Sequence, residues 1–307
     1  MPPHTTQNNV SGHPSVFFIS GSVMEAPPLP TGLYILATPI GNLKDISLRA
    51  LNTLAAADVI FAEDTRVTRI LLTHYGIKTP LVAYHEHNEI SVTEKAIERL
   101  KSGQSVVLVS DAGTPLVSDP GFKLVQAALS QNLPVTSLPG PSAAINALVL
   151  SGLPSDRFFF EGFLPPKSTA RQERMKVLSV IPSTLIFYES PHRLSAMLED
   201  AARVFGARSA VVARELTKLY ETVYRDTLPA LAELFLKNGP PKGEVVVLIG
   251  PASGEIAFDA TDETLDQVLR QALQKFSIKD AAALAASQTK CSKREAYARA
   301  IILAQEK

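Results

Sequence analysis

Three loops of small residues, each preceded by a short expected strand, are the parts of this sequence best suited to hold a ligand. The clearest lies within residues 106–121, where four apolar residues lead into the run 110–115 (SDAGTP). Mostly β-branched residues without polar alternation are typical of a strand buried on both faces, as in a parallel sheet. Small side chains let a ligand lie against the backbone, and Asp111 adds a carboxylate. An ordinary strand-to-helix turn is the alternative for this stretch taken alone.

The same arrangement occurs twice more in the chain. Residues 38–43 (TPIGNL) follow the apolar run 33–37, and residues 139–144 (PGPSAA) follow an expected strand at 134–138. Ligands of open α/β sheets bind at the carboxyl ends of strands, so three such loops favour a binding site over an ordinary turn. The third loop opens a helix, and the free N–H groups and positive dipole end of a helix suit a carboxylate or a ribose hydroxyl.

Charged and polar clusters follow other expected strands. They are residues 63–66 (EDTR), 85–89 (HEHNE), 189–193 (ESPHR) and 214–218 (RELTK). Such clusters are typical of a pocket rim, although a helix N-cap explains Asp64 or Thr65 nearly as well. His85 and His87 stand beside carboxylates, but no further ligands cluster with them. We therefore expect these histidines to face solvent or substrate and expect no metal site.

Alternating strand and helix patterns predict an α/β domain over residues 31–150. Its strands are expected at residues 33–37, 59–62, 81–84, 106–109 and 134–138. A boundary near residues 152–154 leads to a second α/β domain, residues 151–252, with a more mixed sheet. Residues 258–307 show only helical spacing and resemble a small helix-turn-helix unit, with a docking helix bundle as an equal alternative. Residues 1–30, rich in Pro, Ser, Gly, Thr and Asn, are expected to be a mobile, disordered tail.

Composition and motifs exclude several classes of protein. The 307 residues are 46% hydrophobic and 20% charged with no formal net charge, as in a soluble globular protein, so any nucleic-acid contact must come from local basic patches. The single cysteine, Cys291, cannot form an internal disulfide, and neither a signal-peptide pattern nor a membrane-length apolar run occurs, so we expect a cytoplasmic protein. The sequence lacks the G-x-G-x-x-G, P-loop and G-x-S-x-G motifs, which argues against a dinucleotide dehydrogenase, a P-loop NTPase and an α/β-hydrolase.

Seven short motifs together resemble those of one enzyme family. They are residues 37–43 (ATPIGNL), 62–66 (AEDTR), 85–88 (HEHN), 111–115 (DAGTP), 139–143 (PGPSA), 187–193 (FYESPHR) and 214–218 (RELTK). In this order they closely resemble the motif set of the bacterial ribosomal RNA small-subunit methyltransferase I family, a branch of the tetrapyrrole methylase superfamily. The resemblance runs from about residue 33 to residue 250, and the C-terminal helical unit also looks like that of the family.

The resemblance implies both a fold and a reaction. It implies two α/β domains of tetrapyrrole methylase type with a cofactor cleft between them. It also implies S-adenosylmethionine-dependent 2′-O-methylation of a cytidine ribose in small-subunit (16S) ribosomal RNA, by a homodimer with no membrane partner. Carried over by position, the cofactor contacts would be Pro39, Asp111, Ala112, Gly113, Leu116, Ser142 and Ala143.

A ribose hydroxyl is a poor nucleophile, so the implied reaction needs a base, or a lysine that favours the alkoxide. Candidates at strand ends facing the expected cleft are Asp64, Arg66, His85, Glu189, His192, Glu215 and Lys218. Among them we prefer Lys218 together with Glu189, which is equally a candidate for a cofactor or structural contact.

Basic residues that could form a path for RNA phosphates follow the proline-rich segment 164–166. We expect Lys167, Arg171, Arg174 and Lys176, with Arg193 and the basic end of the C-terminal unit, to line that path. The neighbouring aromatic residues 158–160 could stack on bases, but three consecutive phenylalanines in a strand are more typical of a core.

Two other functions compete with this interpretation. A porphyrin-type small-molecule methyltransferase would share the cofactor cleft, but a tetrapyrrole needs neither the basic helix that follows residue 166 nor the C-terminal unit. A cofactor-sensing nucleic-acid-binding protein would instead act through its helix-turn-helix-like end.

Overall fold

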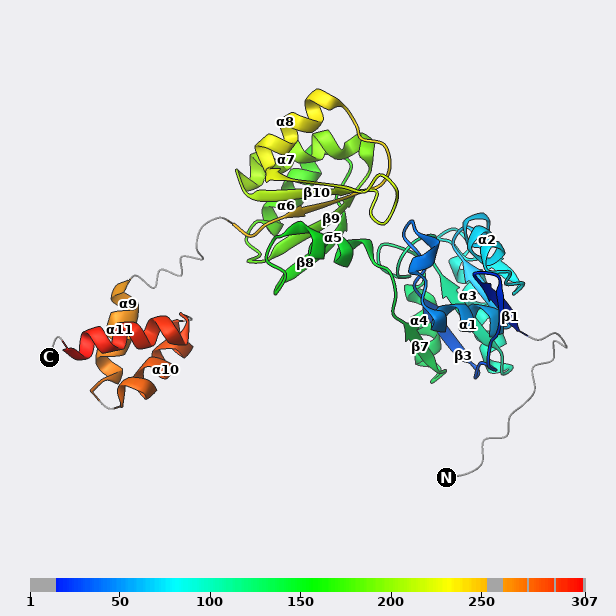
Figure 1. The fold of residues 1–307 in the computed structure, drawn as a ribbon, viewed down its shortest axis with the longest axis horizontal. Helices are drawn as coiled ribbons and strands as arrows, with labels where there is room; N and C mark the ends of the chain where they lie inside the picture. The colour runs from blue at the N-terminus through cyan, green and yellow to red at the C-terminus, as the bar shows by residue number, and fades with distance from the viewer. Residues whose placement is uncertain (1–14, 253–261, 275, 290, 306–307) are drawn as a thin grey trace. The chain divides into compact units, whose positions relative to one another are not determined.

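A computed structural model describes residues 15–252, 262–274, 276–289 and 291–305 (Figure 1). The chain divides into two compact units, residues 1–250 and 251–307, and each is described by itself. The first unit holds two α/β lobes, as the sequence predicts.

The first lobe is built on a parallel five-stranded sheet in the order β5-β4-β6-β3-β7. Its strands are β3 (Gly32–Leu36), β4 (Val59–Ala62), β5 (Leu81–Ala83), β6 (Ser105–Val109) and β7 (Val135–Leu138). Every residue of β3, β4 and β6 is buried, which confirms that the unbroken apolar runs are strands covered on both faces. Because the strands are parallel, the three small-residue loops that follow β3, β6 and β7 emerge at one edge of the sheet.

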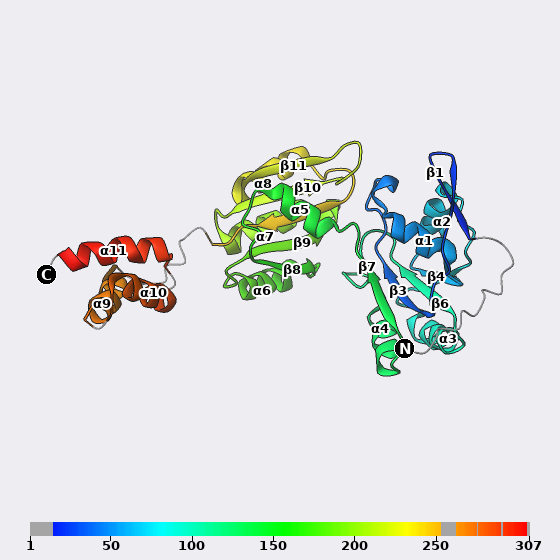
Figure 2. The ribbon, with the colours of Figure 1, turned by 60° about the horizontal axis from the view of Figure 1, so that its bottom comes forward.

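Helices cover both faces of this sheet (Figure 2). They are η1 (Leu43–Asp45), α1 (Leu48–Ala56), α2 (Thr65–His74), α3 (Glu89–Lys101) and α4 (Phe122–Ser130). The apolar stripes of α1 and α2 form one core with alternate strand residues such as Leu36 and Ile60, and those of α3 and α4 form another with Leu33 and Val59. Successive side chains of a strand point to opposite faces of the sheet, so each strand contributes to both cores.

The second lobe has a mixed sheet in the order β11-β10-β12-β9-β8, in which only β8 and β9 are parallel. Its strands are β8 (Phe158–Phe163), β9 (Thr184–Glu189), β10 (Ser209–Arg214), β11 (Thr222–Thr227) and β12 (Val245–Ile249). Its helices are α5 (Ala143–Ser151), α6 (Ser168–Leu178), η2 (Pro191–Arg193), α7 (Leu194–Phe205) and α8 (Leu228–Asn238). Residues of α6, α7 and α8 share one core with one face of the sheet.

Helix α5 belongs by packing to the second lobe, which differs from the predicted boundary near residue 152. Ala144, Ala147 and Leu148 pack against Ile186 and Val211 on the face of the second sheet opposite α6, α7 and α8. The βα pattern assigns a helix to the strand that precedes it in sequence. Here the helix after β7 instead crosses to the neighbouring sheet, so the chain changes lobes within the third small-residue loop.

The expectation of a disordered tail through residue 30 is wrong for residues 16–25. Strands β1 (Val16–Ile19) and β2 (Ser22–Glu25) form an antiparallel hairpin, and the side chain of Phe17 is buried in the core beside α1 and α2. Ser20 and Gly21 both have positive φ, at 50° and 84°, as a two-residue hairpin turn requires. Residues 1–14 lie outside the described residues.

The second unit contains α9 (Asp262–Ala272), α10 (Ile278–Thr289) and α11 (Lys293–Gln305). Its core consists mainly of alanines from α10 and α11 around Leu269 and Leu303, so the helices approach closely. Arg299 of α11 pairs with Asp266 of α9 at 2.6 Å. This arrangement confirms the predicted helical unit, although residues 258–261 lie outside the described residues. Within the described part of the chain, no helix is both long enough and apolar enough to cross a bilayer.

Candidate active site

The three small-residue loops meet at the carboxyl edge of the first sheet. The backbone N–H of Thr38 donates to the carbonyl of Gly113 at 2.8 Å, and the N–H of Gly113 donates back to Thr38 at 3.0 Å. The hydroxyl of Thr114 donates to the carbonyl of Pro141 at 3.2 Å. These contacts confirm the prediction that the loops gather at one place.

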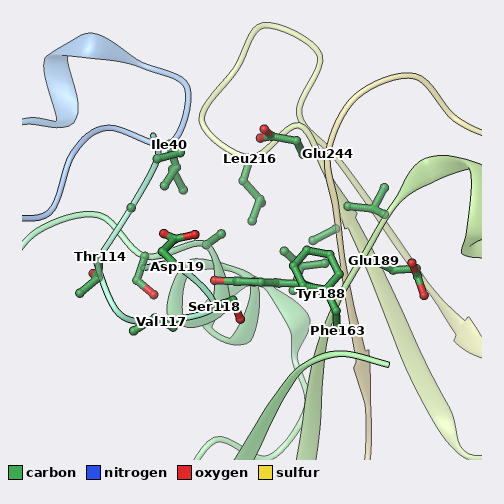
Figure 3. Close-up of a pocket in the computed structure, with 17 residues that line it drawn as sticks. Ile40, Thr114, Val117, Ser118, Asp119, Phe163, Tyr188, Glu189, Leu216 and Glu244 are labelled. Carbon is green, nitrogen blue, oxygen red and sulfur yellow. The ribbon is translucent and has the colours of Figure 1, made fainter. Parts of the chain in front are cut away.

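A cavity of about 220 Å³, here called cavity A, lies between these loops and the second sheet (Figure 3). From the loops it is lined by Ile40, Ala112, Gly113, Thr114, Val117, Ser118, Asp119, Ser142 and Ala143. From the second lobe it is lined by Phe163, Tyr188, Glu189, Ala213, Leu216, Glu244, Val245 and Val246. Four of the seven predicted cofactor contacts therefore line one cavity, and both lobes contribute to its walls.

Asp119 and Tyr188 are the polar groups that face each other across cavity A. Figure 3 shows the carboxyl group of Asp119 and the hydroxyl of Tyr188 pointing toward one another. Burial raises the pKa of Asp119 to about 6, with the nearby charge of Asp111 adding to the effect and a hydrogen bond to Ser110 opposing it. Burial likewise raises the pKa of Tyr188. The cavity therefore disfavours negative charge on both groups.

The loop that carries Asp119 is strained along its length. Leu116 and Ser118 have φ values of +72° and +67°, which cost on the order of 1–3 kcal/mol each for residues other than glycine. The side chain of Leu116 packs with the core of the first lobe and is not among the residues that line cavity A, so a cofactor contact by Leu116 stays a prediction. This packing holds the loop against the core of the first lobe.

A second cavity of about 230 Å³, here called cavity B, adjoins cavity A. Ile40, Ala112 and Glu244 line both cavities. The other residues of cavity B are Thr38, Pro39, Gly41, Leu43, Val67, Thr68, Ile70, Leu71, Ser110, Asp111 and Lys218. Two of the predicted cofactor contacts, Pro39 and Asp111, thus line the neighbouring cavity and not cavity A.

Lys218 reaches cavity B from the loop between β10 and β11. Its Nζ lies 2.9 Å from Oε1 of Glu215 and 3.0 Å from Oε2 of Glu244. Partial burial lowers the pKa of Lys218, but hydrogen bonds to the two carboxylates outweigh that effect, so the pKa is raised and the ammonium is retained. The side chain lies over Gly41, where an added Cβ would be 2.5 Å from Cγ of Lys218.

The structure does not bring Glu189 and Lys218 together. Strand β12 lies between β9 and β10, and Val245 pairs with both Glu189 and Arg214, so the two strand ends are about 10 Å apart. The carboxylates beside Lys218 are instead Glu215 and Glu244, and Glu244 directly precedes the antiparallel strand β12. Glu189 is buried, accepts the N–H of Ser190 at 2.7 Å and pairs with Arg193 at 3.1 Å. Burial raises the pKa of Glu189.

Asp119 gives cavity A a measurable pH signature. The pKa of this carboxyl is 3.8 in its ordinary state and about 6 in the fold, so the protonated form stabilises the folded chain. That stability is present below pH 3.8 and is lost as the pH rises through about 6. Asn carries no charge at any pH, so we expect the unfolding free energy of Asp119→Asn, compared with that of the wild type, to rise by about 2 kcal/mol as the pH goes from 4 to 7. Urea unfolding at several pH values measures this, with the exposed Asp156→Asn as control. Parallel profiles for wild type and Asp119→Asn would contradict the assignment.

Comparison with known proteins identifies the fold. The sequence model described as Tetrapyrrole (Corrin/Porphyrin) Methylases matches residues 32–232, which covers most of both lobes. The chain belongs to the tetrapyrrole methylase family. A second model, described as the RsmI C-terminal HTH domain, matches residues 259–304.

Relatives within this family carry a more specific name. The ribosomal RNA small subunit methyltransferase I of Mesorhizobium japonicum is 48% identical, over 91% of this chain and 94% of the relative. The protein of the same name from Xylella fastidiosa strain Temecula1 is 54% identical, over 76% of this chain and 86% of the relative. The solved structure of diphthine synthase resembles the fold with a TM-score of 0.55 at 19% identity, over 71% of this chain and 89% of that one.

The residues of cavity A fit the methyl donor expected for a tetrapyrrole methylase, S-adenosylmethionine. Leu216, Val245 and Val246 offer apolar surface for an adenine ring. Helix α5 begins at the cavity wall, and the side chain of Ser142 makes no capping hydrogen bond there, so this helix end can receive a carboxylate or a ribose hydroxyl. Among the described residues, the buried Oε2 of Glu189 has no hydrogen-bond partner, which fits a polar ligand group beside it.

The predicted RNA-binding residues fall into two groups. Arg171 is only 3% exposed and pairs with the buried Asp200 at 2.6 Å, so the prediction that it lines an exposed phosphate path is wrong. Arg174 holds both oxygens of Glu161 at 2.6 and 2.7 Å, and Arg193 donates to the carbonyl of Leu164 at 2.7 Å. Lys167 and Lys176 are exposed. The arginines of this segment therefore hold the second lobe together.

Three residues of the site were not singled out from the sequence. Asp119 lies in the stretch 106–121 and Tyr188 in the motif 187–193, and only their position at one cavity separates them from their neighbours. Glu244 precedes a strand, whereas the rule for parallel sheets predicts ligand-binding residues at the carboxyl ends of strands. The antiparallel direction of β12 places its amino end at the same edge as the carboxyl ends of β9 and β10. No pattern in the sequence specifies that direction.

Proposed function

We propose that this protein transfers a methyl group from S-adenosylmethionine to the ribose 2′-hydroxyl of a cytidine in 16S ribosomal RNA of the small subunit. The observation that carries the proposal is the pair of adjoining cavities, A and B, which share the wall formed by Ile40, Ala112 and Glu244. One cavity fits the donor, and the other holds a lysine beside the shared wall. The name of the relatives supports small-subunit ribosomal RNA as the acceptor.

The reaction needs close alignment more than strong acid or base chemistry. When bound, S-adenosylmethionine supplies a methyl carbon on a positively charged sulfur, which becomes a neutral thioether as the ribose oxygen takes the methyl group. Aligning two reactants in a closed cleft contributes on the order of 7–11 kcal/mol. Cavity A meets this need with small residues, Ala112, Gly113, Ser142 and Ala143, that allow the donor to lie against the backbone.

In cavity B, Lys218 and Asp111 serve the ribose hydroxyl. The ammonium of Lys218 stabilises negative charge as it develops on the ribose oxygen. The hydroxyl proton passes to Asp111, whose pKa is raised by burial and which is therefore a better base than an ordinary aspartate. Pro39 shapes the wall of this acceptor cavity. Glu189 lines cavity A, so in this proposal it contacts the methyl donor and not the ribose.

The proposed partner is the small ribosomal subunit, contacted in the cytoplasm. The exposed Lys167 and Lys176 of α6 support contacts with RNA phosphates, as does the helix-turn-helix match in the second unit. The family resemblance supports a homodimer, and light scattering on the full chain tests that state: a mass of about 66 kDa is expected, twice the 33.1 kDa of one chain.

Transfer of a labelled methyl group tests the function. The full chain is incubated with labelled S-adenosylmethionine and, in separate reactions, with unmodified small subunits, naked 16S RNA or a tetrapyrrole. We expect label in small-subunit RNA, at a ribose that resists alkaline cleavage after reaction, and none in the tetrapyrrole. Label in the tetrapyrrole alone would support a porphyrin-type methyltransferase, and cofactor binding without any transfer would support a sensor.

A further inference from the structure

The loop between β10 and β11 displays two large apolar side chains to solvent. Leu219 is 88% exposed and Tyr220 is 67% exposed. The backbone around them is nevertheless fixed, because the N–H of Lys218 donates to Glu215 and the N–H of Glu221 donates to Lys218. An ordered turn that holds a leucine and a tyrosine outward is suited to a partner.

This turn is also strained. The φ values of Glu215 and Thr217 are +52° and +65°, in the left-handed region that residues other than glycine rarely adopt. The carboxylate of Glu221 accepts the N–H of Thr217 at 2.7 Å, which helps to keep the turn in this conformation. The chain therefore holds the turn in an unfavourable backbone geometry that fixes where Tyr220 projects.

The position of the turn links it to cavity B. Lys218, two residues before Tyr220, lines that cavity and packs over Gly41 of the first lobe. Figure 1 and Figure 2 both show the loop between β10 and β11 reaching from the second lobe toward the first. Tyr220 therefore belongs to the loop whose Lys218 lines cavity B.

Helix α2 of the first lobe also contributes to cavity B. Val67 and Ile70 line cavity B and are 40% and 66% exposed. Arg66 lies on the same side of the helix as Ile70, one turn earlier, and its side chain is 89% exposed. Hydrogen bonds to Asp64 raise the pKa of Arg66, and the charge of Asp111 on the cavity wall contributes further. A cation and apolar surface thus stand together on the part of cavity B that the first lobe contributes.

We propose that this mouth of cavity B docks the unpaired RNA on either side of the target nucleotide, with Tyr220 stacking on a base and Arg66 contacting a phosphate. The inference rests on the proposed function, because a nucleotide whose ribose enters cavity B remains covalently joined to neighbours that must cross the rim. Unpaired bases stack on exposed aromatic rings, and phosphates pair with arginine. The existing Arg66–Asp64 pair is exposed, so exchanging it for a phosphate costs little.

Arg69 provides a matched control on the same helix. It is exposed like Arg66, but at 3.6 residues per turn it lies about 100° around the helix from Ile70, compared with about 40° for Arg66, and so stands farther from that wall of cavity B. For Tyr220, the control is Phe158, which is 45% exposed at the start of β8. That end of the strand lies opposite to Phe163, which lines cavity A.

The test uses the full chain with unmodified small subunits and with a fluorescent single-stranded RNA of 16S sequence. We expect Tyr220→Ala to weaken RNA binding and to raise the KM for subunits about 5- to 100-fold with kcat little changed, while Tyr220→Phe stays near wild type. We expect Arg66→Ala to reduce the dependence of log K on log salt by about one phosphate contact. Arg69→Ala and Phe158→Ala should leave both quantities unchanged, and all variants should bind S-adenosylhomocysteine as the wild type does.

Several outcomes overturn the proposal. Tyr220→Ala with wild-type RNA affinity, or Arg66→Ala and Arg69→Ala with equal effects, would show that the rim does not dock RNA. A change from dimer to monomer in Tyr220→Ala without loss of RNA affinity would assign the turn to an interface between copies. If the wild type fails to methylate small-subunit RNA, the proposed function fails; if it methylates and Tyr220→Ala keeps its KM, only this inference fails.

Discussion

Replacing Lys218 with methionine is expected to slow methyl transfer by roughly 100- to 1,000-fold, which is the cost of removing one preorganised charge from a developing oxyanion. Methionine keeps much of the length and apolar surface of the lysine stem, so the packing over Gly41 is preserved. The lost group is the ammonium that Glu215 and Glu244 hold at the wall of cavity B. A single-turnover measurement with saturating donor isolates this step from product release.

Two variants make the result for Lys218 interpretable. Lys218→Arg restores a positive charge at the same place and should recover part of the rate. Lys237→Met removes an exposed cation from the end of α8 and should leave the rate unchanged. A Lys218→Met enzyme that transfers methyl groups at the wild-type rate would remove this lysine from the mechanism and leave the alkoxide without its stabilising charge.

Replacing Arg171 with methionine is expected to cost about 3–5 kcal/mol of unfolding free energy, because it leaves Asp200 as a buried charge without its main partner. Arg171 is 3% exposed, and its Nε lies 2.8 Å from Oδ2 of Asp200. It also donates to the carbonyl of Pro166 at 3.2 Å, so it ties the start of α6 to α7. Urea unfolding of the full chain measures the loss.

Controls for Arg171 come from the same helix and from its partner. Lys176→Met, at an exposed position of α6, should change stability by no more than about 0.5 kcal/mol. The double variant Arg171→Met/Asp200→Leu should recover most of the lost stability, because a pair of apolar residues replaces a pair of charges. If Arg171→Met is as stable as the wild type but binds RNA more weakly, Arg171 contacts phosphate as the sequence predicts.

The sequence predicts the three small-residue loops because each follows an expected strand, and two of those strands, at residues 33–37 and 106–109, are unbroken apolar runs. Strand period and loop composition are local properties, and the parallel sheet then brings Thr38 and Gly113 together without further information. Whether the basic residues after Pro166 are exposed or paired is not a local property of the sequence. A run that contains Arg171 and Arg174 indicates charge, but the acids that neutralise them, Asp200 and Glu161, lie elsewhere in the chain.

The direction of a strand and the sheet on which a helix packs are likewise not predicted from the local sequence. The apolar run 245–249 predicts a strand, but only pairing with its neighbours decides that β12 runs antiparallel and places Glu244 beside Lys218. Helix α5 follows β7 in sequence yet packs on the other sheet, because its apolar face fits the surface left open by α6, α7 and α8. The hairpin at residues 16–25 lies within a segment whose composition is typical of disordered chains, so composition does not predict it.

The central claim is that cavity A holds the methyl donor and cavity B the acceptor. Calorimetric titration of S-adenosylhomocysteine into two variants tests it most directly: Val117→Trp fills cavity A, and Ile70→Trp fills the mouth of cavity B. With both variants shown to be folded, we predict that Val117→Trp loses at least about 100-fold in affinity for this ligand, while Ile70→Trp binds it as the wild type does and fails to methylate small subunits. Equal affinity in both variants, or loss of binding in Ile70→Trp alone, would contradict the assignment of the two cavities.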